Sequence, residues 1–320
     1  MQLSTPGKIP SERLPTLNTW NLESWTNGPE PGEEATGKRL AGFLAGPIYR
    51  YSDNRDIPSL EATSRLSADL RFGTLSVRNI YDQCVRLAAE PLDAPQRKSI
   101  HAFINELIWR EFYFQVLWHW PEVLDQEFNP KYRGLAWRQP GTAFERWCQG
   151  ETGFPIVDAA MRQLNATGFM HNRLRMISAM FLTKDLHIDW RYGERYFMKR
   201  LVDGDIAANN GGWQWSAGTG ADAAPYFRIQ NPWLQTKRFD PEGTFIRQWL
   251  PELRDVATAR LMAPPVDGRP IAKNYPAPML DHSREREISL ALTNHGGVVK
   301  MRRDSREKRG GEAGTGLNIL

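Results

Sequence analysis

The segment from Asp203 to Trp215 gathers residues able to do chemistry, in the order Asp-Gly-Asp-Ile-Ala-Ala-Asn-Asn-Gly-Gly-Trp-Gln-Trp. Carboxylates and amides can hydrogen-bond a polar ligand, and indole rings can stack on a flat one. If the segment is extended, side chains two apart point to opposite sides, so Trp213 and Trp215 would serve different cavities. Gly211 and Gly212 would let a flat ligand approach the backbone closely. The alternative is a polar loop whose tryptophans only pack.

A second polar group occupies one face of a predicted helix that runs from about residue 95 to about residue 120. Glu106, Trp109, Arg110 and Tyr113 stand at i, i+3, i+4 and i+7, so the spacing displays them together. A solvated Glu-to-Arg pair is the simpler interpretation, and the indole beside it favours a ligand-binding face. The opposite face of this helix is expected to form a buried stripe of Ile100, Ile104, Leu107, Ile108 and Phe112.

Helices are expected to position both groups. A helix follows the Ser76 N-cap, Thr142 and Glu145 predict a capping box, and Asp189 caps a helix that leads to residue 203. Further helices are predicted from residue 155 to before residue 168 and over 171–186. Alternating strand patterns do not occur between residues 63 and 260, so the fold class is predicted as all-α and multi-helical. Residues 1–46 are expected to form an extended linker, 47–280 the helical catalytic domain, and 281–320 a C-terminal helix remnant with a disordered tail.

Composition limits the function classes. The 320 residues carry a net charge of +4, which permits an anionic partner such as DNA. The two cysteines and six histidines show no disulfide or metal-ligand spacing, so we expect no metal. Charges interrupt the most apolar run, 103–120, and the N-terminus lacks a signal peptide, so a cytoplasmic protein without a membrane span is expected. Twelve tryptophans suggest stacking or electron transfer.

Four segments together resemble the flavin-binding domain of the photolyase and cryptochrome family, in particular bacterial class I cyclobutane pyrimidine dimer photolyases. They are Thr63-Ser-Arg-Leu-Ser67, Asn105-Glu-Leu-Ile-Trp-Arg-Glu-Phe-Tyr113, Met170-His-Asn-Arg-Leu-Arg-Met176 and Asp203 to Trp215. The resemblance extends from about residue 49 to about residue 263. It implies a helical photolyase-type domain that holds FAD in a U-shaped conformation, with DNA as the substrate.

The same resemblance implies two groups of flavin contacts. Phosphate and ribityl contacts are implied for Tyr51, Thr63, Ser64, Arg65, Leu66 and Ser67. The isoalloxazine ring would be lined by Asn172, Arg175, Asp203, Asp205 and Asn209. Arg175 and Asp203 would form a buried pair, and Asn209 would lie beside flavin N5, where a neutral amide suits the fully reduced, anionic working form.

For the substrate, the resemblance implies a pocket that receives a pyrimidine dimer flipped out of the duplex. Its wall would comprise Glu106, Trp109, Asn172, Met176 and Trp215, with Arg110 and Tyr113 on the same helical face as Glu106. The indoles would stack on the dimer, and Glu106 would hydrogen-bond to it as it becomes a radical anion. Phosphate contacts are implied for Arg55, Arg173 and Arg228.

Trp213, Trp190 and Trp137 match the electron carriers that link the flavin to the surface in this family. The implied mechanism is that light excites fully reduced FAD, an electron passes to the dimer, the cyclobutane ring opens, and the electron returns.

The chain departs from the family pattern at its N-terminus, because 62 irregular residues before Thr63 are too few for the usual antenna domain. We therefore expect no antenna chromophore and a monomer, with possible association through an apolar face left by that domain. The alternatives are blue-light signalling as in cryptochromes, repair of (6-4) photoproducts, and an inert fragment without flavin. The (6-4) branch typically has a histidine where Met176 stands. Retention of Glu106, Trp109, Met176 and Trp215 favours dimer repair.

Overall fold

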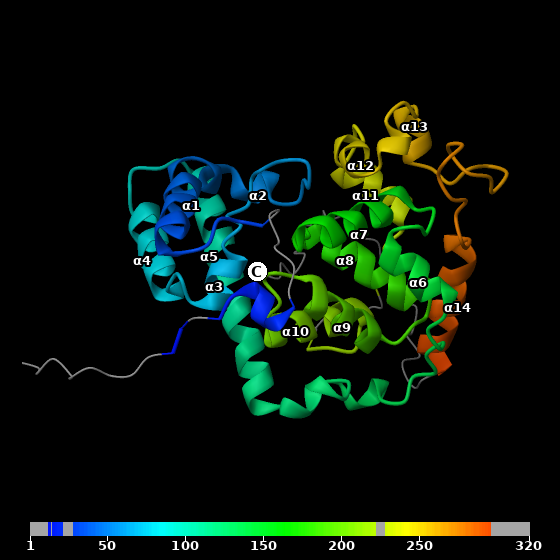
Figure 1. The fold of residues 1–320 in the computed structure, drawn as a ribbon, viewed down its shortest axis with the longest axis horizontal. Helices are drawn as coiled ribbons and strands as arrows, with labels where there is room; N and C mark the ends of the chain where they lie inside the picture. The colour runs from blue at the N-terminus through cyan, green and yellow to red at the C-terminus, as the bar shows by residue number, and fades with distance from the viewer. Residues whose placement is uncertain (1–11, 14, 22–27, 222–227, 296–320) are drawn as a thin grey trace, which may run out of the picture.

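The fold is built from helices throughout the part of the chain that the computed structural model describes, residues 12, 13, 15–21, 28–221 and 228–295, with side chains given up to residue 291 (Figure 1). Within these residues the only strand-like feature is an isolated bridge between Arg138 and Ile188. The all-α prediction is confirmed.

The α-helices are α1 Glu33–Ala45, α2 Tyr51–Asn54, α3 Ser67–Phe72, α4 Val77–Ala88, α5 Ala94–His119, α6 Thr142–Gln149, α7 Pro155–Thr167, α8 Asn172–Met180, α9 Trp190–Arg200, α10 Ile206–Ala217, α11 Pro232–Phe239, α12 Thr244–Trp249, α13 Thr258–Leu261 and α14 His282–His295. Short 3₁₀ turns cover Leu17–Trp20, Pro47–Arg50, Pro121–Leu124, Pro130–Tyr132 and Pro251–Leu253. A π-helical turn, Phe181–Asp185, continues α8, so the predicted helix over 171–186 changes its hydrogen-bonding pattern midway.

Two apolar cores organise these helices. The N-terminal core joins α1, α3, α4 and the first half of α5 through side chains such as Phe43, Leu66 and Phe103. The larger C-terminal core joins α6 to α12 and includes Trp147 and Trp213. Figure 1 shows α1–α4 on one side of the molecule and α6–α9 on the other, so residues from both groups can meet between them.

The prediction of an extended linker over residues 1–46 is wrong at its C-terminal end, because residues 33–45 form α1. Leu40 and Phe43 of α1 are buried in the N-terminal core, and Phe43 packs on Tyr51 and Phe103. Two glycines within the helix, Gly37 and Gly42, obscure its periodicity in the sequence. Packing in the N-terminal core stabilises this helix despite its low intrinsic propensity.

The buried face of α5 also differs from the predicted stripe. Ile108 and Phe112 are 55% and 36% exposed, whereas Glu106 and Tyr113 are buried. The difference arises because α10 packs along the Tyr113 side of α5. Gly211 permits this approach, since a Cβ atom there would lie 2.0 Å from Cδ1 of Tyr113.

The segment that opens at Asp203 is mostly helical, so the extended conformation considered for it is wrong. Asp205 caps α10 by accepting a hydrogen bond from the Ala208 amide at 3.0 Å. Residues two positions apart in an α-helix are rotated by about 200° around the helix axis, so Trp213 and Trp215 still face different sides. Trp213 enters the C-terminal core and Trp215 packs with Met176 and Met180.

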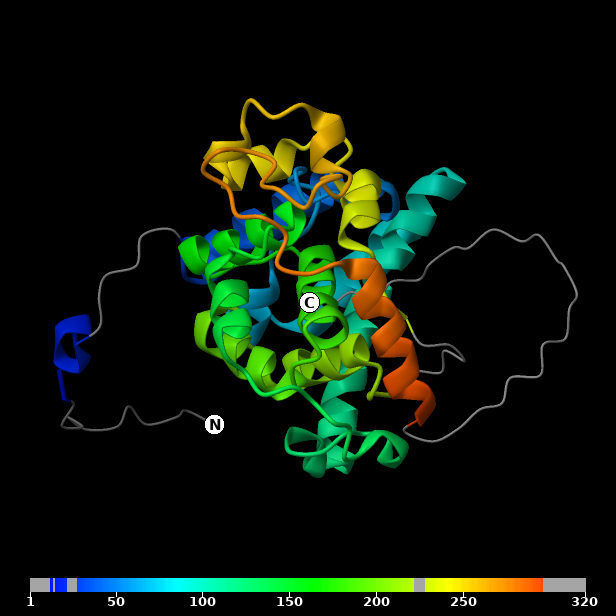
Figure 2. The ribbon, with the colours of Figure 1, turned by 90° about the vertical axis from the view of Figure 1, so that its right-hand side faces the viewer.

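Other predicted helix ends had mixed outcomes. Asp189 caps α9 as expected, because its side chain accepts from the Arg191 amide at 3.0 Å. The capping box at Thr142 is wrong, since Gly141 is the N-cap of α6 and makes no side-chain cap. The C-terminal helix remnant corresponds to α14, which runs along the outside of the molecule (Figure 2), and the predicted disordered tail lies outside the described residues. None of the described helices combines the length and apolarity needed to span a membrane.

Candidate functional site

A cleft between the two cores brings together most of the residues that the sequence marked for the cofactor. It is lined by Tyr51, Arg55, Thr63, Ser64, Arg65, Leu66, Ser67, Phe169, Met170, His171, Asn172, Arg175 and Asp203. Of the expected cofactor residues, Asp205 and Asn209 are not in this lining and lie at the start of α10. Chain segments more than 100 residues apart therefore form one site.

The wall formed by residues 63–67 is a tight turn that leads into α3. Leu66 is buried in the N-terminal core, which anchors the turn. Arg65 has a φ of 51°, a left-handed conformation that a non-glycine residue seldom adopts. The turn presents the hydroxyl groups of Thr63, Ser64 and Ser67 to the cleft, and such donors suit the phosphate and ribityl groups of a dinucleotide.

The opposite wall holds a buried ion pair. Arg175 Nη2 donates to Asp203 Oδ2 at 2.7 Å, and Arg175 Nε donates to the Met170 carbonyl at 2.8 Å. Both charged groups are buried, as the sequence predicts for this pair. Asp203 Oδ1 is also buried and has no hydrogen-bond partner among the described residues. A ligand with an N–H group, such as the imide of a flavin ring, would satisfy this oxygen.

Asn209 is buried on α10 and bound to a residue that the sequence analysis did not identify. Its Nδ2 donates to the carbonyl and to Oε1 of Glu194, at 3.1 and 3.0 Å. Burial raises the pKa of Glu194. Because Nδ2 is committed to α9, Oδ1 is the amide atom available to a ligand. The pairing could not be read from the sequence, since the two residues are 15 apart on different helices.

Glu106 does not line the cleft itself, but it is paired with Arg55, which does. Arg55 Nη1 donates to Glu106 Oε1 at 2.6 Å, and the two side chains are 16% and 3% exposed. The sequence instead offered Arg110 as a helical partner for Glu106, and Arg110 lies over the ring of Phe114 at 4.5 Å. The expected phosphate contact of Arg55 would have to use N–H groups other than the one bound to Glu106 or displace this ion pair.

A methionine and an indole form an apolar surface beside the cleft. Met176, Met180 and Trp215 pack together, and Arg228 lies 5.0 Å over the Trp215 ring. Asn172 Nδ2 and Arg173 Nη1 lie 3.8 and 3.7 Å from the Met176 sulfur. Three residues expected around the dimer or its phosphates, Asn172, Arg173 and Trp215, therefore lie against Met176.

Arg173, which was expected to contact a DNA phosphate, is buried. Its Nη2 donates to Asp56 Oδ2 at 2.8 Å, and its guanidinium lies 4.4 Å over the Phe239 ring. Asp56 is a second partner that the sequence analysis missed, because it comes from the loop after α2. A phosphate contact by Arg173 would compete with this buried pair.

Trp109 and Tyr113 lie on the α5 side of the same region. Their ring centroids are 6.4 Å apart, and Tyr113 and Trp215 both line a narrow cleft between α5 and α10. The expected dimer-binding residues thus come from α5, α8 and α10, and the structure brings these three helices together.

The three tryptophans expected to carry electrons share the C-terminal core, where Trp190 and Trp213 are buried and Trp137 is half-buried. The Trp190 indole N–H donates to Glu127 Oε1 at 3.4 Å. Trp213 contacts Phe197 and Trp147, with centroid separations of 4.9 and 6.1 Å. Trp147 is a further buried indole that the sequence analysis did not include.

Metal-ligating residues do not cluster in the described part of the chain, where no group of three or more His, Cys, Asp or Glu side chains could hold an ion. The polar side chains that line the cleft are hydroxyls, the Asn172 amide, the His171 imidazole and three arginines, of which Arg175 and Arg55 form ion pairs with Asp203 and Glu106. They therefore fit an organic cofactor with phosphate and imide groups.

Comparison with known proteins agrees with this geometry. A family model described as the FAD-binding domain of DNA photolyase matches residues 103–295. The deoxyribodipyrimidine photo-lyase of Vibrio cholerae is 50% identical over 261 residues, which cover 81% of this chain and 55% of that protein. The Escherichia coli protein of the same name is 47% identical over 295 residues, 91% of this chain and 61% of that protein. This chain therefore spans little more than half the length of these relatives.

Solved structures give the same result for the fold. A class III photolyase from Agrobacterium tumefaciens superimposes with a TM-score of 0.77 at 40% identity, covering 83% of this chain and 56% of that one. A cryptochrome from Synechocystis superimposes with a TM-score of 0.78 at 31% identity, covering 87% and 60%. The chain belongs to the family of FAD-binding domains of DNA photolyases.

Proposed function

We propose that this chain is the catalytic part of a photolyase that uses bound FAD and light to repair cyclobutane pyrimidine dimers in DNA. The observation that carries the proposal is the position of Glu106, whose partner Arg55 lines the cofactor cleft while Glu106 itself projects from the helix that carries Trp109. A carboxylate, an indole and a flavin cleft are the parts that dimer repair requires. A DNA substrate would place the protein in the cytoplasm.

FAD would be held by the turn at residues 63–67 on its phosphate side and by Asn172, Arg175 and Asp203 on its ring side. When bound and reduced, it supplies the light-excited electron. The Arg175–Asp203 pair presents a balanced charge to the ring, so the buried cleft carries no isolated ion. Tyr51 closes the cleft and is fixed by Phe43 and Phe103.

Asn209 would orient the ring through its Oδ1 atom, because Glu194 holds its Nδ2. The raised pKa of Glu194 favours the protonated carboxyl near neutral pH relative to an ordinary glutamate. Asp205 supports this arrangement by capping α10.

The dimer would lie against Met176 and Trp215 and between the helices that carry Glu106 and Asn172. Extruding the base pair costs less at a lesion, where stacking and pairing are already weak. An indole stacked on a base contributes about 1–3 kcal/mol, which offsets part of that cost. Methionine at position 176, where (6-4) enzymes typically have histidine, favours a cyclobutane substrate.

In the absence of DNA, Arg55 and Glu106 would remain bound to each other as an ion pair. A phosphate near Arg55 would draw the guanidinium away, and Glu106 would then be available to hydrogen-bond the dimer. Trp213, Trp190 and Trp137 would bring electrons from the surface to the flavin. The indole N–H group of Trp213 is buried and has no hydrogen-bond acceptor among the described residues.

The proposal is tested by purifying the chain, recording its flavin spectrum, reducing it under blue light and following the loss of thymine dimers in an oligonucleotide. We expect bound FAD and light-dependent repair. Absence of bound flavin would contradict every photochemical function. Bound flavin without repair would favour the signalling function of the cryptochromes.

Glu106→Gln should keep the flavin spectrum and slow dimer splitting. Exchange of a charged hydrogen bond for a neutral one costs about 1–1.5 kcal/mol, or about 5–10-fold in rate. The amide retains the size of the carboxyl, so the fold should not change. Repair at the parent rate would show that Glu106 does not act on the dimer.

A further inference from the structure

Helix α3 carries a side chain that reaches across the cofactor cleft. Arg71 lies in the last turn of this helix, and its Nε donates to the Gly204 carbonyl at 2.8 Å. The two residues belong to opposite walls of the cleft. We propose that Arg71 is a positioning residue that clasps the two walls together and thereby slows the release of FAD. The proposal rests on the proposed function, in which the cleft holds this cofactor.

The α3 side of the contact is continuous with the turn at residues 63–67. Ser67 is both the last residue of that turn and the first residue of α3, and it lines the cleft. Arg71 follows about one helical turn later. A movement of α3 would therefore also move the hydroxyl groups that are proposed to contact the phosphates of FAD.

A buried carboxylate fixes α3 on the N-terminal core. Asp69 is 5% exposed and accepts hydrogen bonds from Thr36 Oγ1 and Arg39 Nη2 of α1, both at 2.6 Å. A buried bond between a guanidinium and a carboxylate is among the stronger hydrogen bonds in proteins. Arg71 therefore projects from a firmly held helix, and it can hold a less constrained segment in place.

The segment that receives this contact, residues 202–205, is held by few backbone hydrogen bonds in the described structure. The Val202 N–H donates to the Gly168 carbonyl at 2.8 Å. The Gly204 N–H donates to the Leu201 carbonyl at 3.3 Å, which is long for a bond of this type. A side chain that binds the Gly204 carbonyl therefore adds a substantial part of the restraint on this segment.

Gly204 lies between two residues of the proposed flavin site. Asp203 on one side forms the buried pair with Arg175, and Asp205 on the other side caps α10. Because the backbone at Gly204 connects the two aspartates, the Arg71 contact limits the movement of both. One hydrogen bond at this position can therefore affect how firmly the cofactor is held.

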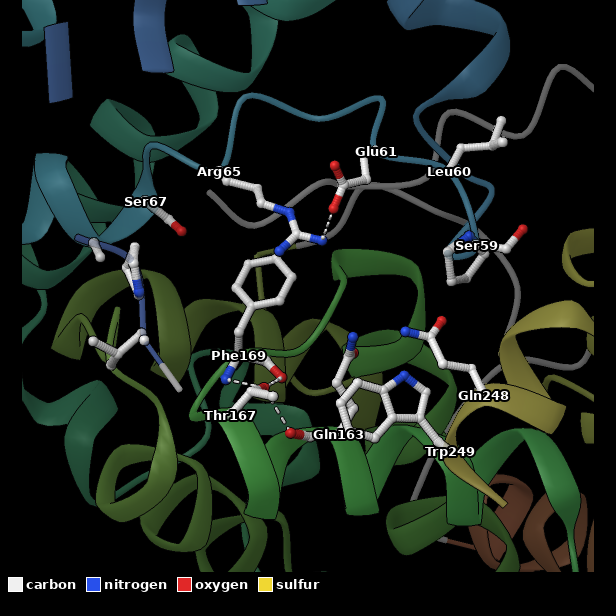
Figure 3. A pocket seen from close by; sticks show the side chains of 15 residues that line it. Ser59, Leu60, Glu61, Arg65, Ser67, Gln163, Thr167, Phe169, Gln248 and Trp249 are labelled. Carbon is white, nitrogen blue, oxygen red and sulfur yellow. Dashed lines mark hydrogen bonds and ion pairs between the residues drawn. The ribbon is translucent and has the colours of Figure 1, made fainter. Parts of the chain in front are cut away.

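The space behind the clasp is larger than the cleft alone. The cleft continues into a cavity of about 370 Å³, and the two share Arg65, Ser67 and Phe169. Figure 3 shows Arg65 over the Phe169 ring, with its guanidinium carbon 5.0 Å from the ring centroid. Arg65 and Arg71 thus reach the opposite wall from the two ends of one short segment. Both are exposed, so their contacts can open when the cofactor enters and close behind it.

The test measures how fast FAD leaves the loaded chain in the dark and without DNA, from the rise in flavin fluorescence after dilution. Arg71→Met removes the donor and should raise the release rate about three- to tenfold, as expected for the loss of one hydrogen bond. Arg71→Gln places an amide N–H at the side-chain position of the arginine Nε without its charge, so FAD should leave at close to the parent rate.

Equal acceleration by Arg71→Met and Arg71→Gln would show that the charge of Arg71 acts and not its hydrogen bond, which would overturn the proposal. An unchanged release rate in Arg71→Met would do the same. Arg78→Met is the matched control, because Arg78 is an exposed arginine on α4 and lies outside the cleft lining. This control should release FAD as the parent does.

Amide hydrogen exchange of the FAD-free chain gives a second measurement that needs no flavin. Arg71→Met should raise exchange at residues 202–208 and leave both cores unchanged, since only this segment loses a restraint. Unchanged exchange there, or an increase spread evenly over both cores, would overturn the positioning role. Failure of the chain to take up FAD, or to repair dimers when loaded, would instead contradict the proposed function. The two proposals therefore fail separately.

Discussion

At the scale of single residues, the cofactor cleft depends on groups that are costly to bury. Arg175 and Asp203 lie 2.7 Å apart with little solvent around either. Each offsets the desolvation of the other, so the pair is stable only as a pair. The same pair would meet the ring of the cofactor, which links the stability of the fold to flavin binding.

Arg175→Met should lower the free energy of unfolding by about 3–5 kcal/mol, because it leaves Asp203 charged and buried without its partner. The measurement is urea unfolding, together with the flavin content of the purified protein, which should fall. Arg86→Met is the control, since Arg86 and Asp82 form an exposed pair whose loss should cost less than about 1 kcal/mol. Equal effects of the two substitutions would contradict the role of the buried pair.

His171 gives the cleft a dependence on pH. Burial lowers the pKa of His171 from 6.5 to about 4, so the unfolded chain takes up the proton first as the pH falls. The stability that neutral His171 contributes is present above pH 6.5 and is lost as the pH falls toward 4. Between pH 7 and pH 5 this loss amounts to about 2 kcal/mol.

His171→Asn should remove that loss, because asparagine does not titrate and can still cap α8, as His171 Nδ1 does for the Arg173 amide. The free energy of unfolding is measured for the parent and the variant at pH 7 and at pH 5. The decrease from pH 7 to pH 5 should be about 2 kcal/mol smaller for the variant than for the parent. Parallel pH profiles would show that folding does not lower the pKa of His171.

At the scale of elements, α10 carries residues of the proposed flavin site, the proposed electron path and the proposed dimer pocket. Its start carries Asn209, its middle carries Trp213, and its end carries Trp215. Two glycines determine how closely it packs. Gly211 lies against Tyr113 of α5, and a Cβ atom on Gly193 of α9 would lie 2.1 Å from the Trp213 ring.

Gly211→Ala should destabilise the protein by about 1–3 kcal/mol, because the new methyl group overlaps the Tyr113 ring and forces α5 and α10 apart. Gly42→Ala in α1 is the control. No atom lies within 4 Å of its added methyl group, so it should stabilise the helix by about 0.5–1 kcal/mol. Thermal unfolding of both variants checks the prediction, and a stable Gly211→Ala protein would contradict this close packing.

At the scale of the whole molecule, the cofactor cleft lies where the two cores meet and the proposed electron carriers lie within one of them. In the proposed function, light-driven reduction of the flavin and repair of the dimer would therefore use different residues. This separation allows the two activities to be tested independently.

Trp213→Phe should strongly slow the reduction of oxidised flavin by light, because phenylalanine is much harder to oxidise than tryptophan. Repair by protein that has been reduced chemically should continue, since Glu106, Met176 and Trp215 are unchanged. The absorbance of the flavin under blue light measures photoreduction. The loss of dimers under light, in protein reduced chemically beforehand, measures repair. Normal photoreduction would place the electron path elsewhere, with Trp147 as the next residue to replace.

The sequence by itself determined the all-α class, most helix positions, the family and the set of residues that gather at the cleft. These follow from local patterns, because helix periodicity, caps and motif spacing are properties of neighbouring residues. Asp189 and Pro155 are examples, since each begins a helix through contacts within a few positions.

Only the tertiary structure decided which polar groups pair across helices. Glu106 binds Arg55 and not Arg110, Asn209 binds Glu194, and Arg173 binds Asp56. It also decided that residues 33–45 are helical and that Gly211 makes room for Tyr113. Such pairings depend on how α5, α8, α9 and α10 approach one another. The paired residues are far apart in the sequence, so no local pattern predicts them, and burial strengthens the contacts that they make.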